Sequence, residues 1–300
     1  MTRKIIYIIN PISGARRKTN LQQIVEEKTS QKKITFKIFP SVASGDYSFL
    51  CSIIREEKIT DIIIAGGDGT VSQVVGSLMN QDVNFGILPC GSGNGLALAA
   101  KIPKQPAKAL DIVFNGKPVN TDGFFVNDHF ACMLSGIGFD AKVAHDFTDS
   151  PKRGLFTYIK LSLKNFFSMQ PHRFTLQLEN KNFEIDAYFI SIANSNQFGN
   201  NFTIAPKASL SDGLLDVVIL TNQNKVSFIL QTLKQLAGWN KLEVSSLIQK
   251  KKGVIYFQTE KLNIINHSMA PMHIDGEPVE TASTLKIEVK KKCFRFIQPV

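Results

Sequence analysis

The hydrophobic residues of the first 120 positions occur in short runs separated by more polar segments. Ile5 to Ile9, Ile34 to Phe39, Ile62 to Ile64 and Phe85 to Leu88 are rich in β-branched and aromatic residues. Such runs are typical of strands that are buried on both faces of a parallel sheet. Hydrophobic positions at helical spacing lie between them, as in the segment 45–57. The pattern predicts an open, doubly wound α/β sheet with a helix after each strand.

After about residue 121 strand-like segments dominate, and this predicts a mostly antiparallel β domain. Two helical segments interrupt it, Leu155 to Met169 and Val226 to Trp239. A chain of 300 residues exceeds the usual size of one core, so two domains are expected, 1–121 and 122–293. The last residues, 294–300, are expected to complete the first domain. The predicted strands of the second domain are Gly123 to Phe125, His129 to Leu134, Phe174 to Leu178, Ile185 to Ala193, Leu214 to Leu220, Val254 to Phe257, Leu262 to Ile265 and Leu285 to Val289.

Composition and charge exclude several classes of protein. The chain is 43% hydrophobic, which is a globular composition, and it carries a formal net charge of +10. That excess fits nucleic acid, an anionic membrane surface or a phosphorylated substrate. The four cysteines are scattered without a C-x-x-C pair, so neither structural zinc nor a disulfide framework is expected. No apolar run approaches the ~20 residues of a membrane-spanning helix or forms a signal-peptide core, so a cytoplasmic location is expected.

Two glycine-rich loops, 66–70 and 91–95, each follow a predicted strand and precede a predicted helix. Glycines let backbone N–H groups approach a phosphate closely, and the start of a helix favours the same anion. A nucleotide phosphate chain is therefore the expected ligand. However, G-x-x-x-x-G-K-[ST], G-x-G-x-x-G and the protein-kinase motifs are all absent. From the residues alone, structural turns remain an open alternative.

Three segments of the chain form an ordered set of motifs, Asn10 to Gly14, Gly66 to Thr70 and Leu88 to Asn94. They are similar to N-P-x-S/A-G, G-G-D-G-T and L-P-x-G-T/S-x-N, and together they resemble the catalytic domain of diacylglycerol and sphingosine kinases. A G-G-D-G-like loop also occurs in NAD kinases and phosphofructokinases, but the ordered set of three is specific.

The resemblance extends over nearly the whole chain. Ser41 to Asp46 is similar to T-x-x-x-G-D, Asp212 to Asp216 to D-G-x-L-D, and Asp275 to Glu277 to D-G-E. The resemblance is greatest to soluble bacterial lipid kinases of about this length. It implies an N-terminal NAD kinase/diacylglycerol kinase-like α/β domain and a C-terminal β-sandwich, with the active site in the cleft between them.

The same resemblance implies roles for particular residues. Asp68 would lie beside the phosphates of ATP and act through Mg²⁺, and Glu277 would accept the proton of the lipid hydroxyl. Phosphoryl transfer needs the phosphate to be held and the acceptor to be deprotonated in line, which hydroxyl, amide and backbone donors and a carboxylate can achieve. The residues expected to bind ATP are Asn10, Ser13, Gly14, Ser41, Gly66, Gly67, Asp68, Gly69, Thr70, Ser92 and Asn94.

A second, structural Mg²⁺ site is implied at Asp212 with the backbone carbonyls of Ser209 and Leu214, an all-oxygen set that suits a hard cation. An ordinary β-turn explains the same residues equally well, so both interpretations are open. Asp140 could face the lipid head group or serve the structure. The aromatic segment 155–169 could dock on a bilayer or pack in the core.

One departure from the family pattern affects the substrate assignment. The common bacterial motif continues as Asn-Asp, whereas this chain has Asn94 followed by Gly95, closer to the Asn-Ala of sphingosine kinases. A second carboxylate near the phosphates is therefore missing. Ser41 and Ser92 stand where many members have Thr, which keeps the hydroxyl.

The sequence thus predicts an ATP- and Mg²⁺-dependent kinase that phosphorylates diacylglycerol or a related lipid. The alternatives are a sphingoid-base or phosphatidylglycerol kinase, an NAD kinase, and a non-catalytic nucleotide- or lipid-binding regulator. No nucleic-acid module is recognisable, and a homodimer is an open alternative. Peripheral attachment to an anionic membrane is expected, at about 1 kcal/mol for each Lys or Arg near the surface. The candidate clusters are Arg16 to Lys18, Lys152 with Arg153, Lys250 to Lys252 and Lys290 to Lys292.

Overall fold

The structure is a computed structural model of the chain. It describes residues 3–11, 20–148, 150, 160–162, 164, 165, 168–178, 181–199, 202, 203, 205–221 and 253–300. Ser13 and Gly14, the predicted helix 226–239, most of the predicted helix 155–169 and three of the four basic clusters lie outside these residues.

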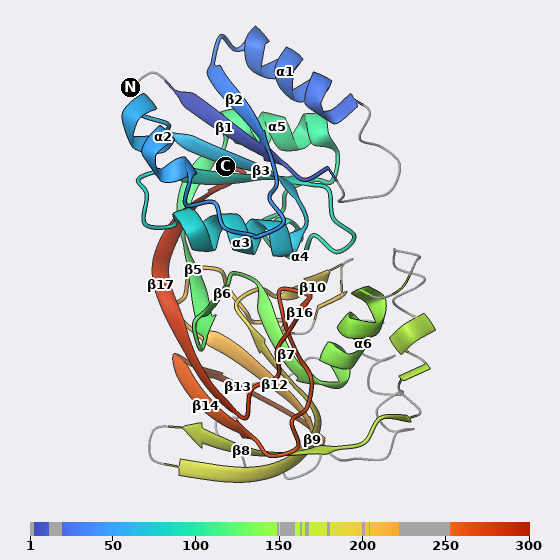
Figure 1. Cartoon of the computed structure of the whole chain (residues 1–300). Coiled ribbons are helices and arrows are strands. Elements are labelled where there is room, and N and C mark those ends of the chain that lie inside the picture. Colours follow the sequence, from blue (N-terminus) through green and yellow to red (C-terminus); the bar gives the residue numbers. More distant parts are fainter. Residues whose placement is uncertain are drawn as a thin grey trace.

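The N-terminal part is a parallel sheet covered by helices on both faces. Its strands stand in the order β4-β3-β1-β2 and pair in parallel. Figure 1 shows α1 and α5 side by side on one face and α3 on the other. The elements are β1 (Lys4–Ile9), α1 (Leu21–Gln31), β2 (Thr35–Pro40), α2 (Leu50–Glu57), β3 (Asp61–Gly66), α3 (Asp68–Leu78), β4 (Asn84–Pro89), α4 (Gly95–Ala99) and α5 (Pro106–Asn115).

These elements confirm the predicted doubly wound sheet, with differences at the ends of helices. The helix expected over 45–57 begins only at Leu50, because Gly45 has a φ of +71° and the residues after it form turns. Helix α3 begins at Asp68, so the last residues of the glycine loop 66–70 form its first turn. Helix α5 was not predicted, although it has Pro106 at its start and buried Ala109, Leu110 and Val113 at helical spacing.

The C-terminal part is built from mostly antiparallel strands, as expected. The predicted strand 129–134 is two strands, and neither α6 nor the hairpin of β15 and β16 was predicted. The elements are β5 (Lys117–Val126), β6 (His129–Ala131), β7 (Leu134–Gly138), α6 (Phe139–Thr148), β8 (His172–Leu178), β9 (Lys181–Ala193), β10 (Gln197–Gly199), β11 (Phe202–Thr203), β12 (Leu215–Thr221), β13 (Val254–Thr259), β14 (Lys261–Asn266), β15 (Met272–Ile274), β16 (Glu277–Val279) and β17 (Thr284–Gln298).

Two long strands connect the two parts. β17 pairs antiparallel with β5 over most of its length, and its residues Arg295 and Phe296 pair in parallel with the start of β4. In Figure 1 the red ribbon of β17 accordingly runs from the lower part of the molecule into the upper sheet, where the chain ends. Helices α3 and α4 lie at the edge of the upper part that faces the lower one.

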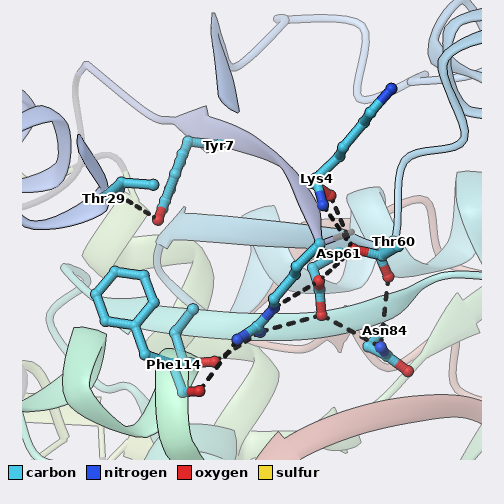
Figure 2. A network of polar contacts seen from close by, with 9 residues as sticks. Lys4, Tyr7, Thr29, Thr60, Asp61, Asn84 and Phe114 are labelled. Carbon is cyan, nitrogen blue, oxygen red and sulfur yellow. Dashed lines mark hydrogen bonds and ion pairs between the residues drawn. The ribbon is translucent and has the colours of Figure 1, made fainter. Parts of the chain in front are cut away.

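A polar network stabilises the amino ends of the parallel strands (Figure 2). Asp61, buried at the start of β3, accepts hydrogen bonds from Arg3 Nε at 2.8 Å and Arg3 Nη2 at 3.1 Å. Arg3 also donates to the carbonyls of Val113 and Phe114 at the end of α5, where a cation complements the helix dipole. This network lies at the end of the sheet opposite to the glycine loops.

In the part of the chain that the structure describes, no helix is both long enough and apolar enough to cross a membrane.

Candidate active site

The predicted nucleotide residues meet at the carboxyl ends of the parallel strands. Asn10 follows β1 and donates its backbone N–H to Ala65 of β3 at 2.9 Å. Ser41 follows β2 and donates its N–H to Ile9 at 3.0 Å. Cys90 follows β4 and donates to Gly66 at 2.9 Å. The sheet therefore places the turns after its four strands next to one another, as the topology of such sheets requires.

The two glycine motifs touch backbone to backbone. A Cβ atom added to Gly91 would lie 2.5 Å from Cα of Gly67, a separation that real Cβ atoms essentially never show. This contact explains why glycine is needed at Gly91. It also holds the loops that begin α3 and α4 close together.

Side-chain amides fix the shape of both loops. Asn10 Nδ2 donates to Thr70 Oγ1 at 2.9 Å, which joins the first motif to the second. Asn94 has a φ of +56°, and its side chain both accepts from Gly91 N at 2.8 Å and donates to Gly91 O at 2.7 Å. Ser92, at the tip of this loop, is exposed.

The Asp68 carboxylate points to the start of α4. Its two oxygens accept the backbone N–H groups of Gly95 at 2.9 Å and Leu96 at 3.1 Å. Burial raises the pKa of the Asp68 carboxyl to about 6; these hydrogen bonds lower it, and the Asp275 carboxylate adds to the rise. Asp68 thus links the second motif to the third.

The start of α3 suits a phosphate group. Gly67 is its N-cap, and no side chain caps it. The first N–H groups of a helix have no partner inside the helix, and the helix dipole is positive there. With the neighbouring donors and the glycine backbone, this helix start is chemically suited to a chain of phosphate groups.

Asp275 anchors the D-G-E motif inside the molecule. Its buried carboxylate accepts the consecutive backbone N–H groups of Cys132, Met133 and Leu134 at 2.9, 3.0 and 2.8 Å. These bonds occupy the residues between β6 and β7, which explains why the predicted strand 129–134 is interrupted. Burial raises the pKa of the Asp275 carboxyl, while the hydrogen bonds from the backbone of this segment lower it.

Glu277 lies against the glycine loop 66–70. It is exposed, at the start of β16, and a Cβ atom on Gly69 would lie 2.7 Å from its Cγ and 3.0 Å from its Oε1. A residue from the C-terminal part of the chain thus lies against the first turn of α3.

The same face of α3 packs closely on the C-terminal part further along the helix. Ser72 donates its hydroxyl to the carbonyl of Phe130 at 3.1 Å. A Cβ atom on Gly76 would lie 3.2 Å from Cδ1 of the Phe130 ring. The small residues on this face let the two parts of the chain approach each other.

The predicted metal ligands lie on an exposed turn before β12. Asp212 Oδ1 accepts the N–H of Leu214 at 3.1 Å, and partial burial and the nearby Asp122 raise the pKa of the Asp212 carboxyl. Asp122 is buried and accepts from Gly213 N at 2.7 Å and Lys292 N at 2.6 Å. A carboxylate, two carbonyls and a neighbouring carboxylate suit Mg²⁺ chemically. Among the described residues no three His, Cys, Asp or Glu side chains cluster as metal ligands, so such a site depends on the carbonyls of Ser209 and Leu214.

Sequence reasoning gave no role to Asp122, and it read Asp275 only as part of a motif. The only signal in the sequence was an acidic residue directly beside an apolar strand-like run, since a carboxylate that becomes buried there requires hydrogen-bond partners. Asp140, for which the sequence left two roles open, is buried in the structure.

The comparisons with known proteins agree with this arrangement. The "Diacylglycerol kinase catalytic domain" family matches residues 4–126, and the "YegS C-terminal NAD kinase beta sandwich-like domain" family matches residues 134–297. The second match confirms the expected β-sandwich. A solved structure of a diacylglycerol kinase from Bacillus anthracis str. Sterne superposes with a TM-score of 0.74 at 17% identity, covering 99% of this chain and 97% of that one.

Curated relatives share both halves. The "Probable lipid kinase YegS-like" protein of Chromohalobacter salexigens is 29% identical over 78% of this chain and 75% of that protein. The "Diacylglycerol kinase" of Bacillus subtilis is 26% identical over 91% of this chain and 89% of that protein. With both domain families matched in order, the chain belongs to the diacylglycerol kinase/YegS family of lipid kinases, phosphotransferases that act on an alcohol group.

Proposed function

We propose that the chain transfers the γ-phosphate of ATP to a hydroxyl of diacylglycerol or a closely related lipid, with Glu277 as the proton acceptor. The observation that supports this most directly is the contact of Glu277 with Gly69. It brings an exposed carboxylate beside the helix start that suits the phosphates. The names of the relatives support a lipid acceptor over NAD.

The residues of the site have different roles in this proposal. The start of α3, with Asn10, Thr70 and the Gly91 loop around it, holds the phosphate chain and neutralises part of its charge. Asp68 keeps the starts of α3 and α4 together through Gly95 and Leu96. Glu277 takes the proton of the lipid hydroxyl as the new P–O bond forms, a role that depends on its position beside the acceptor.

Mg²⁺ belongs to the proposal at two places. At the phosphates it would neutralise charge beside Asp68, and at Asp212 it would order the turn before β12. Attachment to an anionic membrane, a homodimer and a division of the chain at 121/122 stay predictions. Of the basic clusters, only Lys290 to Lys292 falls among the described residues, and there Lys291 pairs with Glu260 at 2.6 Å.

The substitution Glu277→Gln tests the proton acceptor. Because the amide cannot accept the proton, we expect lipid phosphorylation to fall by at least about 100-fold while ATP binding is retained. Glu280→Gln is the matched control, since Glu280 is exposed just beyond β16. Both variants are assayed with labelled ATP in lipid micelles. Undiminished turnover by Glu277→Gln would disprove the role of Glu277.

The acceptor itself is identified with a panel of lipids in the same assay. Diacylglycerol, phosphatidylglycerol, sphingosine, ceramide and undecaprenol present different hydroxyl groups. We expect diacylglycerol to be preferred. Preference for another lipid would support the kinase activity but show that the proposed substrate is wrong. No turnover with any of these lipids would favour a non-catalytic nucleotide- or lipid-binding regulator.

A further inference from the structure

The turn that carries Glu277 has an unusual backbone. Asp275 and Gly276 connect β15 to β16 with φ values of +48° and +84°, the left-handed conformation that two-residue hairpin turns require. Glu277 is the next residue, so the direction of this turn sets where its side chain begins. The three hydrogen bonds to Asp275 hold one side of the turn.

His273 holds the other side. Its ring is buried, with 1% of its surface exposed, and Nδ1 accepts the N–H of Gly276 at 3.3 Å. A neutral imidazole has one acceptor and one donor nitrogen. Acceptance at Nδ1 therefore assigns the ring proton to Nε2. Nε2 lies 3.5 Å from Oδ2 of Asp140.

Asp140 lies in the first turn of α6 and is also buried. Its Oδ1 accepts the N–H of Ala141 at 2.9 Å, which leaves Oδ2 to face His273. Glycine at position 136 makes this meeting feasible. A Cβ atom on Gly136 would lie 2.0 Å from Asp140 Oδ2 and 2.4 Å from His273 Nε2.

We propose that Asp140 and His273 form a positioning pair for the proton acceptor. The negative charge of Asp140, 3.5 Å from Nε2 and not in hydrogen-bond geometry with it, favours the ring proton on Nε2, so that Nδ1 stays an acceptor for the Gly276 N–H and the turn aims Glu277 at the acceptor hydroxyl. The inference rests on the proposed role of Glu277. His273 is not itself the base, because its Nδ1 is engaged by Gly276 and the ring is buried.

Two substitutions at His273 distinguish the roles of its two ring nitrogens. Asn places an amide oxygen near Nδ1 and keeps the acceptor for Gly276, whereas Gln places an amide near Nε2 and loses it. Both remove the ring. We expect His273→Gln to lower kcat about tenfold with an unchanged KM for ATP, and His273→Asn to stay within roughly threefold of the parent.

Asp140→Asn tests the tautomer without a change of shape. The amide oxygen stays with the Ala141 N–H, so the amide NH₂ faces Nε2 and drives the ring proton to Nδ1, against Gly276. We expect kcat to fall about tenfold, as in His273→Gln. Adding His273→Asn to Asp140→Asn should restore kcat to the level of His273→Asn alone. The amide oxygen of Asn accepts the Gly276 N–H whichever side chain stands at position 140, because an amide has no ring proton that could move.

The controls distinguish this inference from the proposed function. His267 is exposed and hydrogen-bonds Thr175, and His267→Gln should match the parent. If Glu277→Gln kept its turnover, the role of Glu277 would be wrong. If Glu277→Gln were inactive while His273→Asn and His273→Gln had equal kcat, or the double variant were no better than Asp140→Asn, the positioning pair would be wrong. Urea unfolding of each variant confirms that folded proteins are compared.

Discussion

At the scale of single residues, Asp68 shows how a motif residue can join loops. Both of its oxygens bind the start of α4, and one donor is the N–H of Gly95. Gly95 stands where the common bacterial pattern has Asp. A carboxylate there would bring a second negative charge next to Asp68, whose pKa burial and Asp275 already raise to about 6. The glycine therefore fits a chain in which Asp68 is the carboxyl at this junction.

This raised pKa predicts a pH dependence of stability. Between the ordinary Asp pKa of 3.8 and about 6, folded Asp68 binds a proton that the unfolded chain does not. The contribution of Asp68 to the free energy of unfolding should therefore fall as pH rises through this window, by at most about 1.4 kcal/mol per pH unit. Asp68→Asn should flatten that slope, whatever it does to the absolute stability.

Urea unfolding of nucleotide-free protein in EDTA, repeated across this pH window, measures the slope. Asp128→Asn is the control, because Asp128 is an exposed carboxylate in the turn between β5 and β6. Equal slopes in Asp68→Asn and the parent would show that Asp68 titrates normally.

At the scale of elements, α3 joins the two halves of the site. Gly69 contacts Glu277, and further along the helix Ser72 and Gly76 contact Phe130. The first turn of α3 is also the proposed phosphate site. The position of Glu277 relative to the phosphates thus depends on how closely the C-terminal part approaches this one helix.

Gly69→Ala tests this approach. The new methyl group would overlap Glu277 Cγ and push the carboxylate aside, while Ala favours a helix over Gly. We expect kcat for lipid phosphorylation to fall about 10- to 100-fold without a loss of stability. Gln73→Ala, at an exposed position of α3, should change neither. Full activity of Gly69→Ala would show that the contact has no part in positioning.

Sequence reasoning predicted the elements with the clearest hydrophobic runs. The strands at Ile5 to Ile9 and Ile62 to Ile64 were found because buried parallel strands need no polar alternation. The hairpin of β15 and β16 was missed because its strands have three residues each. The predicted helix 45–57 starts too early, because the apolar Phe49 continues the helical pattern before α2, although Phe49 is exposed in the structure.

The candidate site was predictable to the extent that its residues form motifs. Local motifs located Asp68, Asn94 and Glu277, since short loops carry them. The contacts of Asp140 with His273 were not predictable, because they join residues over 130 positions apart through a space that Gly136 leaves open. Such contacts depend on strand register, which a single sequence does not specify.

At the scale of the whole molecule, the paired strands β5 and β17 connect the N-terminal and C-terminal parts of the chain. Asp122 accepts from Lys292 in the irregular stretch of β17 and from Gly213 in the turn before β12. A cation at the Asp212 turn would therefore act on the two strands that cross between the halves. Binding there should stabilise the whole fold and not the turn alone.

This reasoning predicts that Mg²⁺ stabilises the nucleotide-free protein. At an Mg²⁺ concentration about 100 times the Kd, the free energy of unfolding should rise by about 2.7 kcal/mol, and EDTA should reverse the rise. Asp212→Asn should lose this response, because it removes the only charged ligand that the turn itself supplies, while Asp128→Asn should keep it. Urea unfolding with and without Mg²⁺ makes the comparison. An equal response in Asp212→Asn would place the ion elsewhere, and no response in the parent would leave the turn as an ordinary β-turn that Asp122 holds without metal.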